Sequence, residues 1–203
     1  MEHLAEYEKA GKIAAKVREK SRDLVKVGAK AVDVANTLED MILKECGIAF
    51  PLNLSINEDA AHYTPGFEDE LTFSENDVIK VDVGTQVDGY IGDTALTIDL
   101  SGEHGKLLEA SEQALEAAIA TVKAGVNVAD IGAVIEKEIT SRGFKPVINL
   151  SGHLLDAYEV HSGFSIPNVE TSAGFELEEG MAIAIEPFAS TGSGTVREST
   201  RTE

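Results

Sequence analysis

Three acidic residues and one histidine lie inside or beside apolar stretches of this chain, where ionisable groups are uncommon. They are Asp82, Asp93, His153 and Glu186. Carboxylate oxygens together with an imidazole nitrogen suit Mn, Fe, Co and Zn, and ligand identity alone does not tell these metals apart. Two such ions bridged by carboxylates would lower the pKa of a shared water, so that hydroxide forms near neutral pH. The residue types therefore predict metal-assisted hydrolysis.

The two aspartates are predicted to share one pair of strands. Val78–Gly84 and Tyr90–Leu100 have strand composition, and a turn signal at Val87-Asp88-Gly89 separates them. If the loop closes at residues 87 and 88, Asp82 lies directly opposite Asp93, about 5 Å away. Two ionised carboxylates at that distance repel each other unless a cation lies between them or one takes a proton. A role as a cap or turn residue is the alternative for either one alone.

Three histidines are candidates for the remaining chemistry. His153 follows Ser151-Gly152, which is predicted to be a turn that lets the side chain point into a cleft. His62 and His161 are predicted at loop or strand-end positions, where they could hydrogen-bond a substrate carbonyl or amide. A structural or surface role is the alternative for each of them.

A weak internal repeat divides the chain into two αβ halves. Lys26–Val34 resembles Lys123–Ile131, with Lys, Gly and Asp recurring at one offset. In each copy a glycine turn precedes an aspartate that can cap a helix. The predicted helices are Glu2–Val27, Thr37–Cys46, Gly105–Lys123 and Ala133–Arg142. Each half continues into an apolar strand that ends in one carboxylate, so we expect the halves to face each other across a pseudo-twofold axis.

The composition limits the partners and the location of the protein. The chain has 203 residues, of which 43% are hydrophobic, and a formal net charge of −19. We expect one domain over residues 1–203, with half-repeats at about 1–101 and 105–198. The charge argues against nucleic acid or an anionic membrane as a partner. With Cys46 as the only cysteine, no signal peptide and no apolar run of roughly 18 residues, we expect a cytoplasmic protein without an internal disulfide.

Taken in order, these motifs resemble the methionine aminopeptidases of type II, the archaeal and eukaryotic branch. Besides the aspartate pair, the resemblance rests on Phe50–Asn57, Ala60–Pro65, Asn149–His153, Tyr158–Gly163 and Ile185–Gly192. It implies the pita-bread fold, an α+β architecture of two related halves, and a site for two divalent metal ions. The implied activity is removal of the initiator methionine from nascent chains. The ribosome is a candidate partner that the sequence neither supports nor excludes.

The resemblance also implies roles for individual residues. The implied metal ligands are Asp82, Asp93, His153 and Glu186. Asp93 would bridge the two ions, and Glu186 would also carry a proton between the attacking water and the leaving amine. The residues implied to contact the substrate are Phe50, Pro51, His62 and His161. The first two would line the pocket for the methionine side chain, and the two histidines would stabilise the tetrahedral intermediate.

One departure from the family concerns its C-terminal part. The family supplies a fifth ligand, a bridging glutamate from a late strand, and the type II branch has a helical insertion before that strand. Seventeen residues follow Glu186, and the tail Glu198–Glu203 is polar without a strand pattern. We therefore expect an incomplete fold that lacks both features, with Glu198 as a weak candidate for the fifth ligand.

Two alternatives to an aminopeptidase remain at the level of sequence. One is a non-catalytic binding protein on the same fold, although four of the five family ligands are present and such proteins usually lose ligands. The other is a related metallohydrolase such as an X-Pro dipeptidase. The segment Tyr158–His161 argues against this alternative.

Overall fold

The computed structural model describes residues 2–172 and 174–198, and the chain divides into two compact units. Unit 1 is built mainly from Gly105–Leu155 and the chain from His161 onward, and unit 2 from His3–His104 and Asp156–Val160. Residues 199–203, predicted to form no strand, lie outside the described residues. The prediction of one domain over residues 1–203 stays a prediction.

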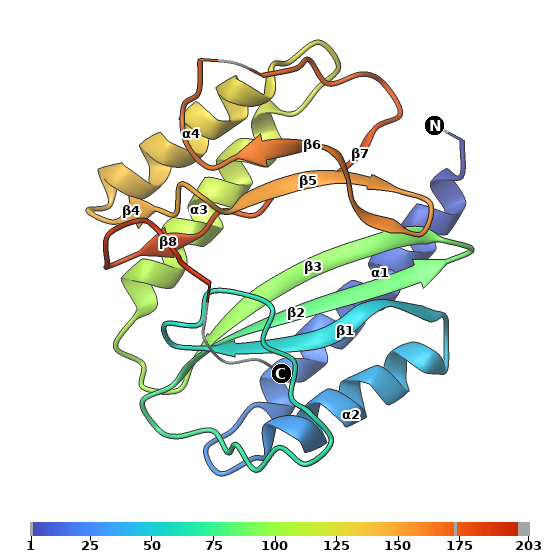
Figure 1. Cartoon of the computed structure of the whole chain (residues 1–203), viewed down its shortest axis with the longest axis vertical. Coiled ribbons are helices and arrows are strands. Elements are labelled where there is room, and N and C mark those ends of the chain that lie inside the picture. Colours follow the sequence, from blue (N-terminus) through green and yellow to red (C-terminus); the bar gives the residue numbers. More distant parts are fainter. Residues whose placement is uncertain (1, 173, 199–203) are drawn as a thin grey trace. The chain divides into compact units, whose positions relative to one another are not determined.

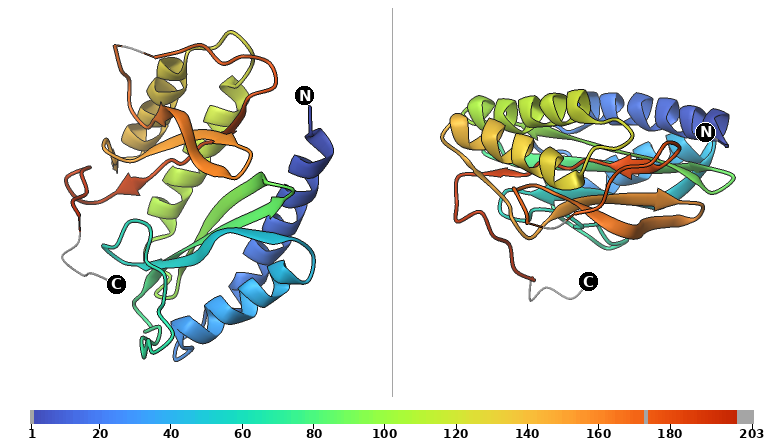
Figure 2. Two further views of the ribbon diagram at one scale, coloured as in Figure 1. Left: turned by 45° about the vertical axis from the view of Figure 1, so that its right-hand side comes forward. Right: turned by 90° about the horizontal axis from the view of Figure 1, so that it is seen from above.

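Unit 2 is a three-stranded antiparallel sheet with two helices on one side (Figure 1). Its elements are α1 (Leu4–Leu24), α2 (Ala31–Leu43), β1 (Gly47–Ile56), β2 (Val78–Val87) and β3 (Tyr90–Asp99). The strand order is β1-β2-β3, and the core lies between the sheet and the helices. Figure 2 shows α1 and α2 on the same side of these strands. One sheet face is therefore covered by the two helices, and the other face carries no helix of unit 2.

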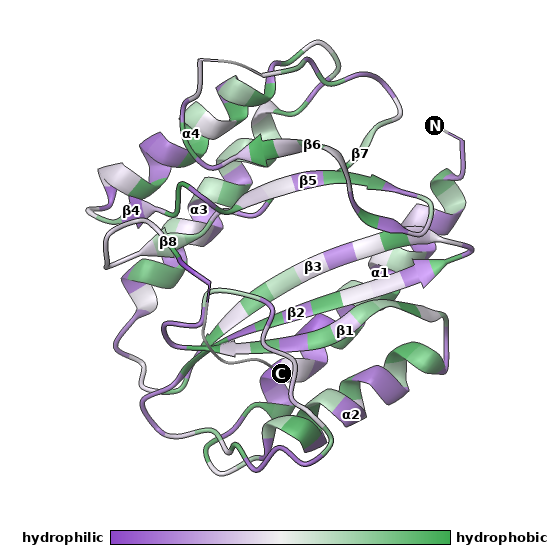
Figure 3. Cartoon of the chain, in the orientation of Figure 1, coloured by the Kyte–Doolittle hydropathy of each residue, from purple (hydrophilic) through white to green (hydrophobic). Residues whose placement is uncertain are grey.

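Alternation along β2 decides which side chains reach each face. Ile79, Val81 and Val83 are fully buried in the core shared with the helices. Because successive residues of a strand point to opposite faces, Asp82 and Gly84 lie on the face away from the helices. Figure 3 shows hydrophobic and hydrophilic stretches alternating along α2, the pattern of a helix with one buried side.

The turn between β2 and β3 corrects the predicted register. Asp88 and Gly89 both have positive φ, 52° and 92°, and Val87 pairs with Tyr90. These are the features of a two-residue type I′ turn, which aspartate–glycine favours. Consequently Asp82 pairs with Ala95 rather than with Asp93, and the prediction that the two aspartates lie directly opposite each other is wrong.

Unit 1 packs two helices against a second small sheet. Its elements are α3 (Gly105–Thr121), α4 (Val128–Ser141), β4 (Lys145–Pro146), β5 (Ser151–Asp156), β6 (Glu159–Pro167), β7 (Ala182–Ala184) and β8 (Ala189–Ser190). One sheet has the order β6-β5-β7, and β4 pairs with β8. Its core is dominated by α4, where Ile131, Ile135 and Ile139 are fully buried.

Backbone hydrogen bonds repeat the same local motif in the two units. In unit 2 the Gly28 amide donates to the Phe73 carbonyl at 2.7 Å, and in unit 1 the Gly125 amide donates to the Leu177 carbonyl at 2.7 Å. The two glycines have φ values of 83° and 84°, a conformation that costs glycine little. The internal repeat is therefore present in the backbone, at the turns where the sequence similarity was detected.

The helices after these turns begin earlier than predicted. α2 starts at Ala31 and α4 at Val128, with Lys30 and Asn127 in the cap positions. Asn127 accepts a hydrogen bond from the Ala129 amide, whereas the predicted caps Asp33 and Asp130 lie inside the first helical turn. Acidic residues are favourable there through the helix dipole, which explains why their pattern resembled a cap.

Candidate functional site

Asp82 and Asp93 lie on the helix-free face of the unit 2 sheet. Asp93 pairs with Gly84, two positions from Asp82 along β2, so the carboxylates occupy diagonal positions on one face. Cβ atoms at such positions are about 7–8 Å apart or slightly less. Both residues are half-buried. The diagonal spacing leaves room for a cation between the two carboxylates.

Phe50 reaches the same face through an irregularity in β1. Phe50 pairs with Gly84 and Asn53 pairs with Asp82, so β1 has one residue more than β2 between these pairs. This is a β-bulge, and it places Phe50 and Asn53 on one face although they are three residues apart. A Cβ atom on Gly84 would overlap the Phe50 ring. The glycine therefore lets an apolar ring lie beside the Asp93 position.

His62 lies in the loop between β1 and β2, as predicted. It is exposed and has a φ of 69°, which few non-glycine residues adopt. The next residue holds this conformation in place, because the Tyr63 carbonyl accepts from the Leu54 amide at 2.8 Å and the Tyr63 amide donates to Ser55 Oγ at 3.2 Å. Pro51, on β1, is exposed.

A lysine also lies on this face, two residues before Asp82. Burial lowers the pKa of Lys80 to about 8, and the negative charges of Asp59 and Glu58 oppose this shift. Its ammonium group donates to the Asn57 carbonyl at 2.8 Å. Lys80 thus ties the start of the loop that carries His62 to the strand that carries Asp82.

In unit 1 the candidate residues touch one another. His153 Nε2 lies 2.9 Å from Glu186 Oε1, and the His153 side chain is only 9% exposed. Nδ1 of His153 is 3.2 Å from the Leu154 carbonyl, which favours a proton on Nδ1 and leaves Nε2 as the ligand atom. The His161 ring packs edge-on against the His153 ring, with centroids 4.5 Å apart. An imidazole, a carboxylate and a second imidazole therefore form one cluster.

Strand pairing brings this cluster together. His153 pairs with Ala184 in the β5–β7 ladder, and Glu186 follows two residues after Ala184. A Cβ atom on Gly152 would overlap the Ala184 carbonyl oxygen, so only glycine permits this close approach. The prediction that Ser151-Gly152 is a turn is wrong, because both residues begin β5. His161, predicted at a loop or strand-end position, is the third residue of β6.

Sequence reasoning missed three residues that shape these groups. They are Asn53, Gly84 and Gly152. Asn53 stands between two buried leucines. Because strand residues alternate between faces, a polar residue at that point indicates a side chain on the face opposite the leucines. The two glycines lie inside strand patterns, where an isolated glycine often marks the close approach of another group.

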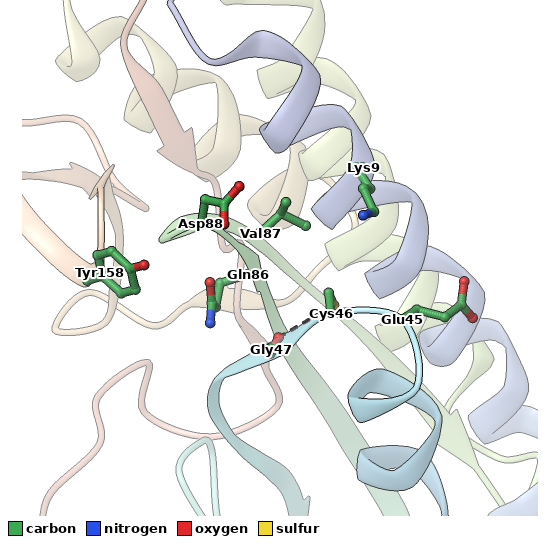
Figure 4. A pocket seen from close by; sticks show the side chains of 8 residues that line it. All are labelled: Lys9, Glu45, Cys46, Gly47, Gln86, Val87, Asp88 and Tyr158. Carbon is green, nitrogen blue, oxygen red and sulfur yellow. Dashed lines mark hydrogen bonds between the residues drawn. The ribbon is translucent and has the colours of Figure 1, made fainter.

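A polar cavity of about 340 Å³ lies elsewhere in unit 2 (Figure 4). Its lining residues are Lys9, Glu45, Cys46, Gly47, Gln86, Val87, Asp88 and Tyr158. It contains none of the predicted site residues. Cys46, the last residue of the predicted helix Thr37–Cys46, is half-buried and lies beyond the end of α2. Partial burial raises the pKa of its thiol, so it carries little thiolate at neutral pH.

The donor atoms fit a divalent metal. Unit 2 offers two carboxylates on one sheet face, and unit 1 offers an imidazole nitrogen 2.9 Å from a carboxylate oxygen. Mixed oxygen and imidazole donors are typical for Mn, Fe, Co and Zn. A buried imidazole with its other nitrogen at a carbonyl is the usual arrangement of a histidine that ligates metal.

Comparison with known proteins identifies the class. A model of metallopeptidase family M24 matches residues 5–200, so the chain belongs to this family of metallopeptidases. Within the family it is similar to methionine aminopeptidases. It is 49% identical over 192 residues to the methionine aminopeptidase of Pyrococcus abyssi, which covers 93% of this chain and 65% of that protein. The chain therefore spans less than two thirds of the length of this relative.

Two solved structures extend the comparison. The methionine aminopeptidase of Thermotoga maritima has a TM-score of 0.88 at 31% identity, covering 97% of this chain and 84% of that one. A dipeptidase from Pyrococcus horikoshii has a TM-score of 0.78 at 29% identity, covering 92% and 52%. The predicted pita-bread fold is confirmed, as is the predicted resemblance to methionine aminopeptidases. In the described part of the chain, no helix has the length and hydropathy of a membrane span.

Proposed function

We propose that this chain carries the catalytic centre of a methionine aminopeptidase that removes the initiator methionine from nascent proteins. The observation that carries the proposal is its 49% identity to the methionine aminopeptidase of Pyrococcus abyssi over 93% of this chain. The contact between His153 and Glu186 and the shared face of Asp82 and Asp93 add to it. Because nascent chains emerge in the cytoplasm, the proposal includes a cytoplasmic location, and the ribosome is a candidate partner.

Four residues would hold two divalent ions, of Co, Mn, Fe or Zn. They are Asp82, Asp93, His153 and Glu186, with Asp93 as the bridging ligand. When bound, such ions lower the pKa of a water and polarise the substrate carbonyl. The free α-amino group of the peptide would dock near these ions, which would account for cleavage at the N-terminus and not within the chain.

The other candidate residues would act on the substrate directly. Glu186 would take a proton from the attacking water and deliver it to the leaving amine nitrogen. His161 and His62 would donate hydrogen bonds to the carbonyl oxygen as it becomes negatively charged. Phe50 would contact the methionine side chain, since its ring lies beside the Asp93 position, and Pro51 would line the same pocket. A long unbranched thioether suits an apolar aromatic wall.

The test is release of methionine from the peptide Met-Ala-Ser by the full 203-residue chain. The chain is stripped with a chelator, assayed, and assayed again after addition of Mn²⁺ or Co²⁺. We expect release only with metal. If the chain binds metal and cleaves neither Met-Ala-Ser nor other peptides, the enzymatic proposal fails and a binding protein on this fold takes its place.

An X-Pro dipeptidase is the second candidate, and the match to the Pyrococcus horikoshii dipeptidase at 29% identity favours it. The dipeptide Ala-Pro separates the two activities, because it has no methionine and carries proline after the scissile bond. We expect Met-Ala-Ser to be cleaved far faster. Faster cleavage of Ala-Pro would replace the aminopeptidase assignment with the dipeptidase.

A further inference from the structure

Asn53 joins the two segments that the proposed function assigns to the substrate. The residue is 7% exposed, and its Nδ2 group donates to the Pro51 carbonyl and to Thr64 Oγ1, both at 2.9 Å. The first acceptor belongs to the Phe50-Pro51 segment of β1. The second lies two residues after His62. Both N–H groups of one amide are therefore used, one on each segment.

The position of Asn53 in the sheet places this link beside the candidate metal ligands. Asn53 pairs directly with Asp82, so its side chain lies on the face that carries the candidate metal ligands. The bulge that separates Phe50 from Asn53 leaves local backbone without a regular ladder, and the Pro51 carbonyl lies within it. The Asn53 amide thus donates one hydrogen bond to the bulge, at the Pro51 carbonyl, and the other to the His62 loop, at Thr64 Oγ1.

The loop depends on contacts of this kind for its conformation. His62 has a φ of 69°, which is unfavourable for a residue with a side chain, and it persists only when neighbouring contacts impose it. Those contacts come from three consecutive residues of β1: Asn53 holds Thr64, the Leu54 amide holds the Tyr63 carbonyl, and Ser55 Oγ holds the Tyr63 amide. The Asn53 bond is the side-chain contact closest to the candidate ligands.

We propose that Asn53 is a positioning residue that sets the placement of His62 relative to Phe50 and Pro51, and thereby the discrimination among N-terminal side chains. The role in discrimination among N-terminal side chains rests on the proposed function. The hydrogen-bond arrangement itself belongs to unit 2 and does not depend on turnover. In this role Asn53 acts through its two N–H groups, which both donate to protein atoms.

A pair of substitutions at Thr64 isolates the link. Thr64→Val removes the acceptor at nearly constant shape, while Thr64→Ser keeps the hydroxyl. Asn53→Ala removes the donor itself. Thr140→Val serves as a matched control, because that hydroxyl bonds to the Glu136 carbonyl within α4. All variants are made in the full chain.

The first readout is amide hydrogen exchange of residues 58–66 and of Leu54. We expect exchange to rise at least about tenfold in Asn53→Ala and Thr64→Val, because the loop opens locally when its restraint is lost. Thr64→Ser and Thr140→Val should match the unchanged chain. Equal exchange in Thr64→Val and Thr64→Ser overturns the proposal, whether or not the chain is active.

The second readout is the kinetics with Met-Ala-Ser and with the analogues beginning with norleucine and leucine. We expect KM for Met-Ala-Ser to rise about tenfold in Asn53→Ala and Thr64→Val, with kcat changed less than about threefold and the preference over leucine reduced. Affinity for Mn²⁺, measured by calorimetry, should stay within about twofold, since Asp82 keeps its strand pairing. Loss of kcat together with metal affinity would overturn the positioning role and indicate damage to the metal site.

The two hypotheses fail separately. If the unchanged chain releases no methionine with metal bound, the proposed function fails, and the exchange data alone decide whether Asn53 holds the His62 loop. If the chain is active and exchange rises in Asn53→Ala while KM and the preference for methionine do not change, the role in discrimination is overturned.

Discussion

The two units repeat one turn and helix motif but present their candidate ligands in different ways. Unit 2 has three strands of ten residues each and places Asp82 and Asp93 on the sheet face that carries no helix of this unit. Unit 1 has a three-residue strand, β7, and Glu186 lies just beyond it, in contact with His153. In both units the two ligands are displaced by two positions from direct pairing. An offset of two residues from the direct partner is therefore common to both units.

The difference between the units lies in the ligand type and in the glycine that shapes each group. Unit 2 offers oxygen atoms alone, and Gly84 makes room for the Phe50 ring beside them. Unit 1 offers an imidazole with a carboxylate, and Gly152 makes room for the Ala184 carbonyl. The repeated motif supplies the scaffold, and the strands that differ supply distinct chemistry. Four tests address this comparison.

The largest effect is expected from Asp93→Asn. The substitution removes a charge and keeps the volume, so the unit 2 group should lose its affinity for metal while the fold persists. We expect turnover of Met-Ala-Ser to fall at least about 10³-fold, which corresponds to about 4 kcal/mol. Calorimetric metal titration measures the loss of metal affinity, and a thermal melt shows whether the fold persists. The control is Asp88→Asn in the neighbouring turn, because asparagine readily adopts the positive φ of that position. Unchanged turnover in Asp93→Asn would reject the bridging role.

His161→Ala tests the unit 1 cluster without removing a proposed ligand. We expect turnover to fall about 10²-fold, or about 2.7 kcal/mol, because a hydrogen bond to the developing charge is lost. The metal content, measured by mass spectrometry of the purified protein, should not change. A variant that loses its metal would make His161 a ligand and enlarge the difference between the units.

Gly152→Ala tests whether close strand approach creates the His153–Glu186 contact. A methyl group at this position overlaps the Ala184 carbonyl, so β5 and β7 must separate. We expect a loss of about 1–3 kcal/mol in the free energy of unfolding, the usual cost of overpacking, together with weaker metal binding. Denaturant titration measures the first quantity. Gly105→Ala, where nothing lies within 4 Å of the added atom, should leave both unchanged.

The smallest effect concerns Asp99, which stabilises the end of unit 2 and has no proposed part in the metal site. Although its partial burial raises the pKa of Asp99, hydrogen bonds from Ser101, His104 and Gly102 lower it below the ordinary value of 3.8 overall. The carboxylate is thus favoured in the folded state, so its contribution is present above pH 4 and is lost as the pH falls through the lowered native pKa.

Asp99→Asn should therefore cost about 1 kcal/mol at pH 7, a magnitude reduced by solvent, and progressively less below about pH 4. Denaturant unfolding at a series of pH values measures the difference. Asp40→Asn, at an exposed position on α2, is the control for the loss of one negative charge. A difference that stays constant down to pH 2 would contradict the assignment.

Much of the scaffold was predictable from local pattern. The helices α1 and α3 and the strands β2 and β3 lie close to their predicted bounds, because their apolar spacing is regular over many residues. The errors fall where two local signals compete. Ser151-Gly152 has the composition of a turn, yet it begins β5, and Gly152 lies against the distant Ala184 carbonyl, which no local pattern reveals.

The register of Asp82 and Asp93 shows the same limit on a smaller scale. The strands and the turn residues were recognised, but the loop was closed one residue too early. Asp88 and Gly89, and not Val87, occupy the two positive-φ positions. An error of one loop position shifts every pair by two residues, which keeps each side chain on its face and changes its partner.

The sequence by itself determined the internal repeat, the family, the residue types of the candidate site and the strand pair that carries the two aspartates. These follow from spacing and alternation, which act over a few residues. Only the tertiary structure decided that Phe50 and Asn53 share a face, that Asn53 links Pro51 to Thr64, and that His153 meets Glu186. Bulges and strand partners depend on which distant segments pack together, and that choice is made by the whole core and not by any one segment.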